Sequence, residues 1–497
     1  MTASTKLSAA TTFEVHNPAD GELTGVYPVH TRAEVDAAVA AAHPAGTWWA
    51  ALGFAERARR LDAWRGEIAR DRAGLAELIH VEMGKPVPDA KLEIAMALEH
   101  LRWAARHAER VLGRRSVRPS LLTANHAASV EYRPYGVVGV IGPWNYPVFT
   151  PLGSLSFALA AGNAVVFKPS EYTPGVGLRL AEAFARVVPE QPVFQVVTGL
   201  GETGNALCRS AVGKIGFTGS TATGKRVMAA CAENLTPLLM ECGGKDALIV
   251  DADADLEAAA DAVVWGGLSN AGQTCLAVER VYVHTSVYER FVTELVARAR
   301  AIEAGTPESK IGPITMPKQV DIIRRHIEDA LARGARLLLG GTEGIRGQFV
   351  QPTILADVPE DAAAITEETF GPTLTVTRVR DMDEAVELVN AGSYGLGSTV
   401  FARRDGERIA ARLRAGGTSI NAFVAHATIP TLPLGGVGGS GFGRVHGPDG
   451  LKEFAYAKAT TRQRFPSPLP LTTFRRTERI DAVVDALVAV LHGRARR

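Results

Sequence analysis

Apolar residues recur at three- and four-residue spacing among arginines and glutamates from Thr31 to about Arg110. This spacing places the apolar side chains on one face of a helix, and it predicts three amphipathic helices over the stretch. We interpret these helices as packing elements.

Short runs rich in β-branched residues replace this pattern from about residue 129. Gly/Pro turns and helical stretches separate the runs, and this alternation predicts βαβ units around a parallel sheet with helices on both faces. Sheets of this kind bind ligands at the carboxyl ends of their strands. The predicted strands are VVGVIG (137–142), AVVFK (164–168), PVFQVV (192–197), KIGFTG (214–219) and ALIVD (247–251).

A second α/β pattern covers about 252–440. It predicts a separate domain, because a new set of helices and strands begins after the first set is complete. Glycine and proline become dense near 416–447, which predicts loop. The predicted helices lie near 255–268, 287–303, 317–333 and 382–391, and the predicted strands are RVYVH, LLLGG, TLTVTRV and STVFA.

The tail from Arg475 to Arg497 carries apolar residues between arginine clusters, with Asp481 and Asp485 among them. The run is too short and too interrupted to span a bilayer, so it predicts an amphipathic helix. Packing against the same subunit or a neighbour is the favoured role, and a peripheral membrane contact is the alternative. The apolar positions are Ile480, Val483, Val484, Leu487, Val488, Val490 and Leu491.

Length and charge narrow the class of protein. A chain of 497 residues is long enough for two or three domains, and the apolar content is that of a globular α/β protein. The net charge of +1 argues against a nucleic-acid partner, which needs a basic surface. The first thirty residues lack a signal-peptide core, and no apolar run reaches membrane-spanning length, so we expect a soluble protein. The small number of cysteines, without C-x-x-C spacing, favours a reducing, cytoplasmic location.

Four cysteines lie at 208, 231, 242 and 275, without C-x-x-C spacing. Neither a metal site nor a disulfide framework is expected from this distribution. Cys275 follows a helix in the small, polar run SNAGQTC, where a thiol can be accessible beside backbone donors. A cysteine taken alone is more often a small buried apolar residue, and we interpret the other three in that way.

Glu241 ends the apolar strand TPLLMECGGKD. Burial raises the pKa of a carboxyl group and makes it a usable base near neutral pH, whereas a solvent-exposed glutamate at a strand end would have no such role. Gly243 and Gly244 allow a sharp turn that could direct the Glu241 side chain into a cleft.

Two loops follow predicted strands. Asn145 lies in GPWNYP after VVGVIG, where its amide could donate to a developing oxyanion, although an asparagine between prolines is often a plain turn residue. The run GFTGS (216–220) opens a helix directly after a strand, and backbone N–H groups there suit a pyrophosphate. It matches neither the Walker pattern nor G-x-G-x-x-G.

These motifs occur in an order that resembles the aldehyde dehydrogenase superfamily. Together they cover nearly the whole chain: GPWNYP (142–147), KPSE (168–171), GFTGS (216–220), ECGGK (241–245), GQTC (272–275), EETFGP (367–372) and GGSGFGR (438–444). The resemblance implies an α/β fold with a Rossmann-type cofactor domain, an α/β catalytic domain and a small oligomerisation element. It assigns 1–114 and 134–243 to the cofactor-binding domain, 244–443 to the catalytic domain, 115–133 and 444–470 to oligomerisation strands, and 471–497 to the C-terminal amphipathic helix.

The resemblance also implies an NAD(P)-dependent oxidation of an aldehyde to its acid. Cys275 would be the nucleophile and Glu241 the general base, and Asn145 with the backbone N–H of Cys275 would form the oxyanion hole. A homodimer or homotetramer is implied as well. The implied cofactor-binding residues are Trp144, Lys168, Ser170, Glu171, Gly216, Thr218, Gly219, Ser220, Glu368 and Phe370.

Particular residues indicate the acyl acceptor, the cofactor and the charge of the substrate. Glu241 favours hydrolysis, because CoA-acylating relatives generally lack this glutamate. Glu171 would accept hydrogen bonds from a ribose 2′-OH and repel a 2′-phosphate, which favours NAD over NADP. The segment after Asn145 has no arginine that could bind a substrate carboxylate, although Arg280 could substitute for one.

A medium-sized apolar or aromatic aldehyde is therefore the expected substrate. Gly153 is smaller than the residue that many aliphatic-aldehyde enzymes carry there, and Phe149 adds an aromatic wall. Cys242 and Leu434 depart from the usual Leu and Phe of the family. A semialdehyde-specific or CoA-acylating enzyme and a catalytically silent structural or binding homologue are the alternatives, and the last would be expected to lack one of the three catalytic residues.

Overall fold

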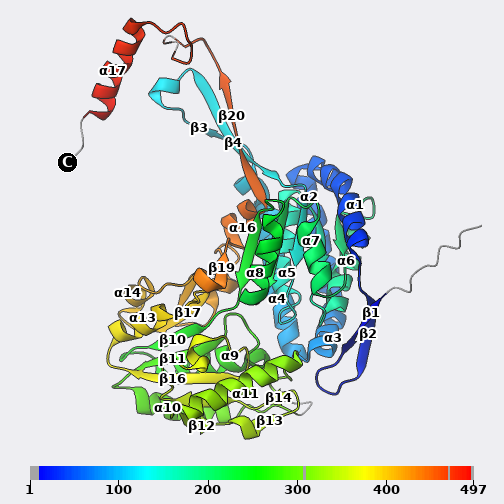
Figure 1. The fold of residues 1–497 in the computed structure, drawn as a ribbon, viewed down its shortest axis with the longest axis vertical. Coiled ribbons are helices and arrows are strands. Elements are labelled where there is room, and N and C mark those ends of the chain that lie inside the picture. Colours follow the sequence, from blue (N-terminus) through cyan, green and yellow to red (C-terminus); the bar gives the residue numbers. More distant parts are fainter. Residues whose placement is uncertain (1–10, 306–308, 468, 470, 494–497) are drawn as a thin grey trace, which may run out of the picture. The chain divides into compact units, whose positions relative to one another are not determined.

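The computed structural model describes residues 11–305, 309–467, 469 and 471–493. The chain forms two compact units. Unit 1 comprises residues 1–112 and 133–456, and unit 2 comprises residues 113–132 and 457–497 (Figure 1). Residues 1–10 of the predicted cofactor domain, and 468, 470 and 494–497 of the predicted C-terminal segments, lie outside the described residues.

Unit 1 begins with an antiparallel hairpin of β1 (Thr12–His16) and β2 (Leu23–Pro28). Four helices follow in the described chain, namely α1 (Arg32–Ala51), α2 (Gly53–Arg70), α3 (Arg72–Met83) and α4 (Val87–Leu112). The sequence analysis predicted three, and this number was wrong. The backbone breaks the pattern at Gly53 (φ +76°) and at Gly84 (φ +78°), which have the left-handed conformation that glycine tolerates.

The first sheet has the strand order β19-β9-β8-β5-β6-β7. All pairs are parallel except β19 with β9. Its strands are β5 (Val137–Ile141), β6 (Ala164–Lys168), β7 (Phe194–Val196), β8 (Lys214–Gly219), β9 (Leu238–Cys242) and β19 (Gly441–Phe442). The connecting helices are α5 (Phe149–Ala161), α6 (Pro174–Val187), α7 (Gly201–Arg209) and α8 (Thr221–Ala232).

The second sheet has the order β12-β15-β16-β11-β10-β17-β18, with only β12 antiparallel to its neighbour. Its strands are β10 (Asp246–Val250), β11 (Val278–His284), β12 (Arg336–Leu339), β15 (Thr353–Ala356), β16 (Thr373–Val379), β17 (Gly397–Phe401) and β18 (Gly417–Ile420). The run ALIVD was grouped with the first sheet by sequence, which was wrong. Gly243 and Gly244 separate it from β9, and β10 pairs with β11 and β17 instead.

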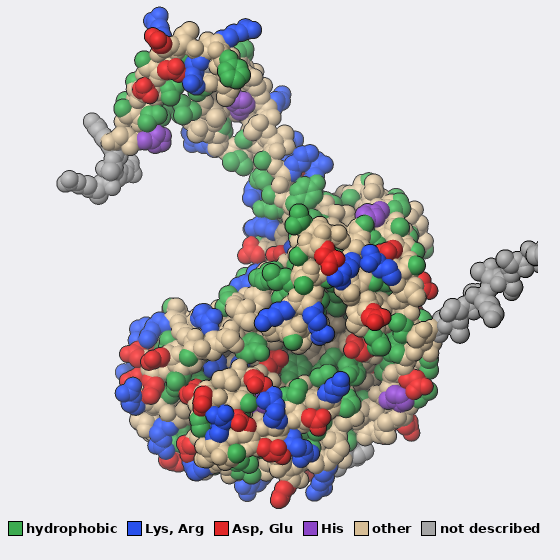
Figure 2. Space-filling model, in the orientation of Figure 1, with side chains coloured by type: hydrophobic (Ala, Val, Ile, Leu, Met, Phe, Trp, Pro, Cys, Tyr) green, Lys and Arg blue, Asp and Glu red, His purple; other side chains and the backbone are tan. Residues whose placement is uncertain are grey.

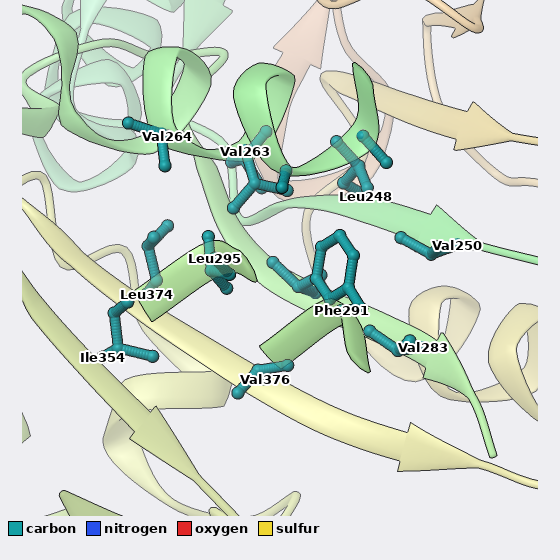
Figure 3. Packing of buried hydrophobic residues seen from close by; sticks show 14 of the residues in the cluster. Leu248, Val250, Val263, Val264, Val283, Phe291, Leu295, Ile354, Leu374 and Val376 are labelled. Atoms are coloured by element: carbon teal, nitrogen blue, oxygen red, sulfur yellow. The ribbon is translucent and has the colours of Figure 1, made fainter. Parts of the chain in front are cut away.

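Helices cover both faces of the second sheet. α9 (Leu256–Leu268) and α10 (Tyr288–Arg300) pack on one face, where Val263, Phe291 and Leu295 meet Leu374 and Val376 of β16 (Figure 3). α13 (Met382–Ala391) and α14 (Gly406–Ala410) pack on the opposite face of the sheet. There they form an apolar cluster with Ile249 of β10 and Tyr282 of β11. The alternation of strand side chains between two apolar layers explains why β10 is a nearly continuous apolar run.

Unit 1 contains further helices and strands. They are α11 (Pro317–Ala332), β13 (Ile345–Arg346), β14 (Phe349–Val350), α12 (Ala363–Thr366), α15 (Ala425–Thr428) and α16 (Gly447–Glu453). The stretch 416–447, predicted as loop, contains β18, α15 and β19 as short regular pieces.

Unit 2 contains a sheet with the order β20-β4-β3, formed by β3 (Arg115–Val117), β4 (His126–Pro134) and β20 (Ala455–Gln463). Helix α17 (Glu478–His492) lies within the predicted C-terminal helix and buries none of its residues. Within the described part of the chain, no helix has the length and apolar character needed to cross a membrane.

Candidate active site

The carboxyl ends of parallel strands bring several predicted site residues to one edge of the first sheet. β9, β8, β5 and β6 are neighbours and run in the same direction. Glu241 lies near the end of β9, the 218–220 loop follows β8, Asn145 follows β5, and Lys168 ends β6. This edge is where open α/β sheets bind their ligands.

Asn145 is buried, and its loop is fixed by several hydrogen bonds. Its Nδ2 donates to the carbonyl oxygen of Gln273 at 3.0 Å. Its own carbonyl oxygen accepts from Lys85 Nζ at 2.7 Å and from Asn270 Nδ2 at 3.1 Å. An amide nitrogen carries two N–H groups, so one remains beyond the bond to Gln273.

A buried ion pair between Lys85 and Glu93 stabilises the loop that carries Asn145. Lys85 Nζ pairs with the Glu93 carboxylate, and both side chains are almost fully buried. The second Glu93 oxygen accepts the backbone N–H groups of Val148 and Phe149, at 2.8 and 3.0 Å. Lys85 Nζ also lies 3.7 Å from the centre of the Tyr146 ring. The pair thus fixes the start of α5 and the loop that carries Asn145.

Cys275 follows an irregular turn at the end of α9. Asn270 and Ala271 have φ of +52° and +56°, which is rare for residues other than glycine. Gln273 stabilises the turn, because its Nε2 donates to the carbonyl oxygens of Asn270 and Pro313. Strained backbone of this kind is typical of functional sites.

The thiol environment is acidic. Cys275 is partly buried, and burial raises the pKa of its thiol well above the usual value. The Glu241, Asp246 and Glu368 carboxylates raise it further, whereas a backbone hydrogen bond involving Leu276 lowers it. Cys208, Cys231 and Cys242 are buried free thiols, as the sequence analysis interpreted them.

Glu241 is a buried carboxyl group. Thr218 Oγ1 donates to its Oε2 at 3.2 Å from the neighbouring strand, where the two residues are paired in register. Burial raises the Glu241 pKa to about 7, and the bond from Thr218 opposes the rise. A carboxyl group with this pKa exchanges a proton readily near neutral pH.

The KPSE loop follows β6. Lys168 is buried and its Nζ donates to the carbonyl oxygen of Pro169, while Glu171 Oε2 lies 3.7 Å from the same nitrogen. Ser170 Oγ contacts Glu171 Oε2 at 3.4 Å. The loop therefore presents one cation and one partly exposed carboxylate at the sheet edge.

Ser220 caps helix α8, and its Oγ accepts the backbone N–H of Thr223. The positive end of the helix dipole faces the loop that Gly219 and Ser220 form, which suits a pyrophosphate. Gly216 does not reach this loop. It lies inside β8, where an added Cβ would meet Ser154 Oγ of α5 at 3.3 Å.

Glu368 and Phe370 lie on a loop before β16. Glu368 Oε1 accepts the backbone N–H of Gly244 at 3.0 Å, and its carboxylate lies so close to Gly243 that a Cβ at that position would displace it. Phe370 has φ of +50° and meets Trp144 edge-to-face with centroids 5.6 Å apart. The aromatic pair joins the loop after β5 to the loop before β16.

A second buried ion pair holds the 368–370 loop. The Glu279 carboxylate accepts the backbone N–H groups of Thr369 and Phe370 and pairs with Lys245 Nζ. Lys245 Nζ also donates to Thr369 Oγ1 at 2.9 Å. Sequence reasoning missed both ion pairs, because nothing in the local patterns shows that Lys85, Glu93, Lys245 and Glu279 are buried.

A cavity of about 230 Å³ contains Cys275 and Glu241 in its lining. The face of unit 1 seen in Figure 2 carries a hollow with hydrophobic side chains inside it. Asn145 is not part of the cavity lining, but its neighbour Tyr146 is. The apolar lining residues are Leu92, Met96, Phe149, Trp265, Leu276, Phe423, Val424, Ala427, Leu434 and Val445, and the polar ones include Lys85, Asp89, Thr150, Ser269, Thr274, Thr428 and His446.

Gly153 leaves no extra room in this cavity, because His446 fills the space beside it. A Cβ on Gly153 would lie 2.8 Å from His446 Nε2. Arg280 is also absent from the lining, and its Nε donates to the carbonyl oxygen of Lys245. Among the described residues, no group of three side chains is arranged to hold a metal ion.

Known proteins are similar to this chain over nearly its whole length. The model of the aldehyde dehydrogenase family matches residues 5–460. A 4,4′-diapolycopene aldehyde oxidase of Methylomonas sp. is 37% identical over 92% of this chain and 87% of its own length. A putative succinate-semialdehyde dehydrogenase [NADP(+)] 2 of Mycobacterium bovis is 35% identical over 90% of this chain and 89% of its own length.

A solved structure, PnpE from Pseudomonas in complex with nicotinamide adenine dinucleotide, has a TM-score of 0.88 and 34% identity. The match covers 93% of this chain and 96% of PnpE. Since the family model and the relatives both span nearly the whole chain, the protein belongs to the aldehyde dehydrogenase family and is an NAD(P)-dependent oxidoreductase of α/β fold.

Proposed function

We propose that this enzyme oxidises an apolar aldehyde to the carboxylic acid through a thioester on Cys275. The observation that carries the proposal is that Cys275 and Glu241 line one cavity, while the Asn145 amide is bonded to Gln273 in the nucleophile's own segment. All three catalytic residues are present, which argues against a catalytically silent homologue.

The nucleophile must add before oxidation can occur. A hydrogen leaves an aldehyde carbon as hydride only when that carbon carries an oxyanion. The Cys275 thiol therefore first releases its proton to solvent, and the thiolate adds to the carbonyl carbon to give a thiohemiacetal oxyanion. The free N–H of Asn145 and the backbone N–H of Cys275 stabilise the oxyanion. A bound oxidised nicotinamide, which Glu368 and Phe370 would hold, would supply the hydride acceptor, and its positive charge would favour the Cys275 thiolate.

Hydrolysis of the thioester is the role of Glu241. Its carboxylate takes a proton from water, the resulting hydroxide adds to the thioester carbon, and the Cys275 thiolate leaves with release of the acid. A carboxyl group with a pKa of about 7 suits this task, because it is basic enough to accept the proton and acidic enough to lose it to solvent. The presence of this base favours water over CoA as the acyl acceptor.

The cavity lining supports an apolar or aromatic aldehyde of medium size or larger. Apolar side chains dominate it, and no arginine from the described residues is part of it. Lys85 is the one cation in the described lining, and Glu93 neutralises it. A substrate carboxylate would lack a free cationic partner there. The semialdehyde alternative rests on the M. bovis relative, whose name refers to succinate semialdehyde.

For the cofactor, we propose a preference for NAD. The partly exposed Glu171 carboxylate supports it, since a 2′-phosphate would be repelled there. The comparisons favour neither cofactor over the other, because the M. bovis relative is named for NADP(+) and the PnpE structure holds NAD. We propose that the remaining cofactor contacts come from Trp144, Lys168, Ser170, Thr218, Gly219, Ser220, Glu368 and Phe370. Gly216 is proposed to act indirectly, by letting α5 approach β8.

The proposal also covers the oligomeric state of the protein and its location in the cell. The domain limits given by sequence, and a homodimer or homotetramer joined through the strands of unit 2, stay predictions. Helix α17 is proposed to pack against protein, with membrane contact as the less favoured alternative. Four free cysteines support a reducing, cytoplasmic location.

An aldehyde panel tests the function. Hexanal, benzaldehyde and succinate semialdehyde are each supplied with NAD or NADP, with and without CoA, and the reduced cofactor is followed by absorbance. The proposal expects higher kcat/KM for the apolar aldehydes, free acid as the product and no effect of CoA. A clear preference for succinate semialdehyde would favour the semialdehyde alternative, and an acyl-CoA product would overturn hydrolysis by Glu241.

A further inference from the structure

Two of the apolar residues that line the catalytic cavity are also exposed to solvent. Leu92 on α4 and Trp265 on α9 have exposed fractions of 48% each, yet both belong to the cavity lining. A residue that is half exposed and also lines a cavity lies where the cavity opens. The opening is thus bordered by apolar side chains from two helices that are far apart in sequence.

The apolar border continues along the chain next to α15. Ala427 and Thr428 line the cavity, and Ile429 and Leu432 directly after them are 45% and 40% exposed. The backbone N–H of Leu432 donates to the carbonyl oxygen of Ile429, so the two residues lie on one turn. We name Leu92, Trp265, Ile429 and Leu432 the rim.

Exposed apolar residues scattered singly need no explanation, but a group beside an apolar cavity does. Catalysis by Cys275 and Glu241 does not use the rim. Nor does the fold need it, since helices α4 and α9 both bury other residues in the core and present these two side chains outward. The rim instead extends the apolar character of the cavity onto the surface.

We propose that the rim binds the distal part of an apolar aldehyde that is longer than the cavity. This inference rests on the proposed function and names its substrate class, which is a long-chain hydrocarbon aldehyde. The reacting carbonyl lies at Cys275, the first carbons fill the cavity, and the later carbons leave it over Leu92 and Trp265. Each methylene that the rim covers adds to the binding free energy, so kcat/KM rises with chain length beyond the cavity.

The size of the cavity supports this division of the substrate. A volume of about 230 Å³ lies below the range of several hundred to 1,000 Å³ that is usual for sites enclosing a whole drug-sized ligand. A short aldehyde fits inside, whereas a long one must extend past the opening. The rim offers it an apolar surface there.

The test compares aldehydes of increasing length in four forms of the full chain. Butanal, hexanal, decanal and dodecanal are supplied to the wild type and to Leu92→Gln, Trp265→Gln and Met228→Gln. Both rim changes are at exposed helical positions, where glutamine keeps the helix. Met228 on α8 is 51% exposed and outside the cavity lining, so it is the matched control.

In the wild type, kcat/KM should rise from butanal to dodecanal. In Leu92→Gln and Trp265→Gln, the values for decanal and dodecanal should fall roughly tenfold more than the value for butanal. Met228→Gln should match the wild type for every aldehyde. Equal losses for short and long aldehydes, or no gain with length in the wild type, would overturn the role of the rim while leaving the proposed function intact. A wild type that oxidises none of the four would overturn both.

Discussion

The Asn145 amide is bonded to the carbonyl oxygen of Gln273, two residues before Cys275, at 3.0 Å. The two residues are 128 positions apart in the chain, and they come from loops beside different sheets. This bond leaves one N–H of Asn145 for a ligand and fixes its direction relative to the nucleophile.

Replacement of Asn145 by Ala should therefore reduce kcat by about a hundredfold or more, because one donor to the oxyanion is lost. The Kd for NAD should stay within about twofold, since the Asn145 side chain has no proposed contact with the cofactor. Stopped-flow absorbance and calorimetric titration measure the two quantities. A large loss of cofactor affinity with an unchanged rate of hydride transfer would contradict the assignment.

Glu241 should lower stability in the pH range where it functions. Its pKa is about 7 in the folded protein and 4.5 in its ordinary state, so the folded protein holds its proton more strongly than the unfolded chain does. Stability is then lost as pH rises from about 4.5 to about 7, by up to roughly 3 kcal/mol. Glu241→Gln, which does not ionise, should raise the Tm relative to wild type at pH 8 and raise it less at pH 5.

The same group should control the pH dependence of turnover. Since only the carboxylate can take a proton from water, kcat for thioester hydrolysis should increase as pH passes through about 7. A kcat that is flat from pH 6 to pH 8 while hydrolysis limits the rate would argue against Glu241 as the base.

Glu279→Gln should loosen the loop that carries Glu368 and Phe370. The change leaves Lys245 buried without its anionic partner and weakens two hydrogen bonds to backbone N–H groups, so we expect a loss of about 3 kcal/mol in the free energy of unfolding. The KM for the cofactor should rise. Urea titration measures the first effect and steady-state kinetics the second.

Glu289→Gln provides the matched control. Glu289 pairs with Arg378 on the surface, where its side chain is 78% exposed, and its loss should cost less than about 1 kcal/mol. Equal effects of the two substitutions would mean that the Glu279 pair does not hold the loop.

Glu171→Gln should shift the cofactor preference toward NADP. Removal of the carboxylate removes the repulsion of a 2′-phosphate and leaves Lys168 available to it, so the ratio of kcat/KM for NADP to that for NAD should rise about tenfold. An unchanged ratio, measured with one aldehyde at saturation, would place the adenosine ribose elsewhere.

The sequence predicted the α/β class and most strands, because β-branched runs between Gly/Pro turns have few other interpretations. It predicted three helices between Thr31 and about Arg110 where the structure has four, since the breaks at Gly53 and Gly84 lie within a continuous amphipathic pattern. It also grouped β10 with the wrong sheet, because two parallel sheets in succession have the same local pattern.

The sequence predicted only part of the candidate site. The order of the motifs indicated Cys275, Glu241 and Asn145, which the structure brings near one cavity. Lys85 and Glu93 could not be found in this way, because an ion pair becomes recognisable only when burial and partner are known. Gly216 was assigned to the cofactor by its motif, yet its surroundings are α5 and Phe454.

The most direct test of the central claim is intact mass spectrometry of Glu241→Gln after mixing with NAD and hexanal. Oxidation can proceed in this variant but hydrolysis cannot, so one equivalent of reduced cofactor should form in a burst and the protein should gain the mass of an acyl group on the peptide that contains Cys275. Glu241→Gln combined with Cys275→Ala should give neither. An acyl group on Cys208, Cys231 or Cys242, or a burst-free loss of activity with no adduct, would contradict the account.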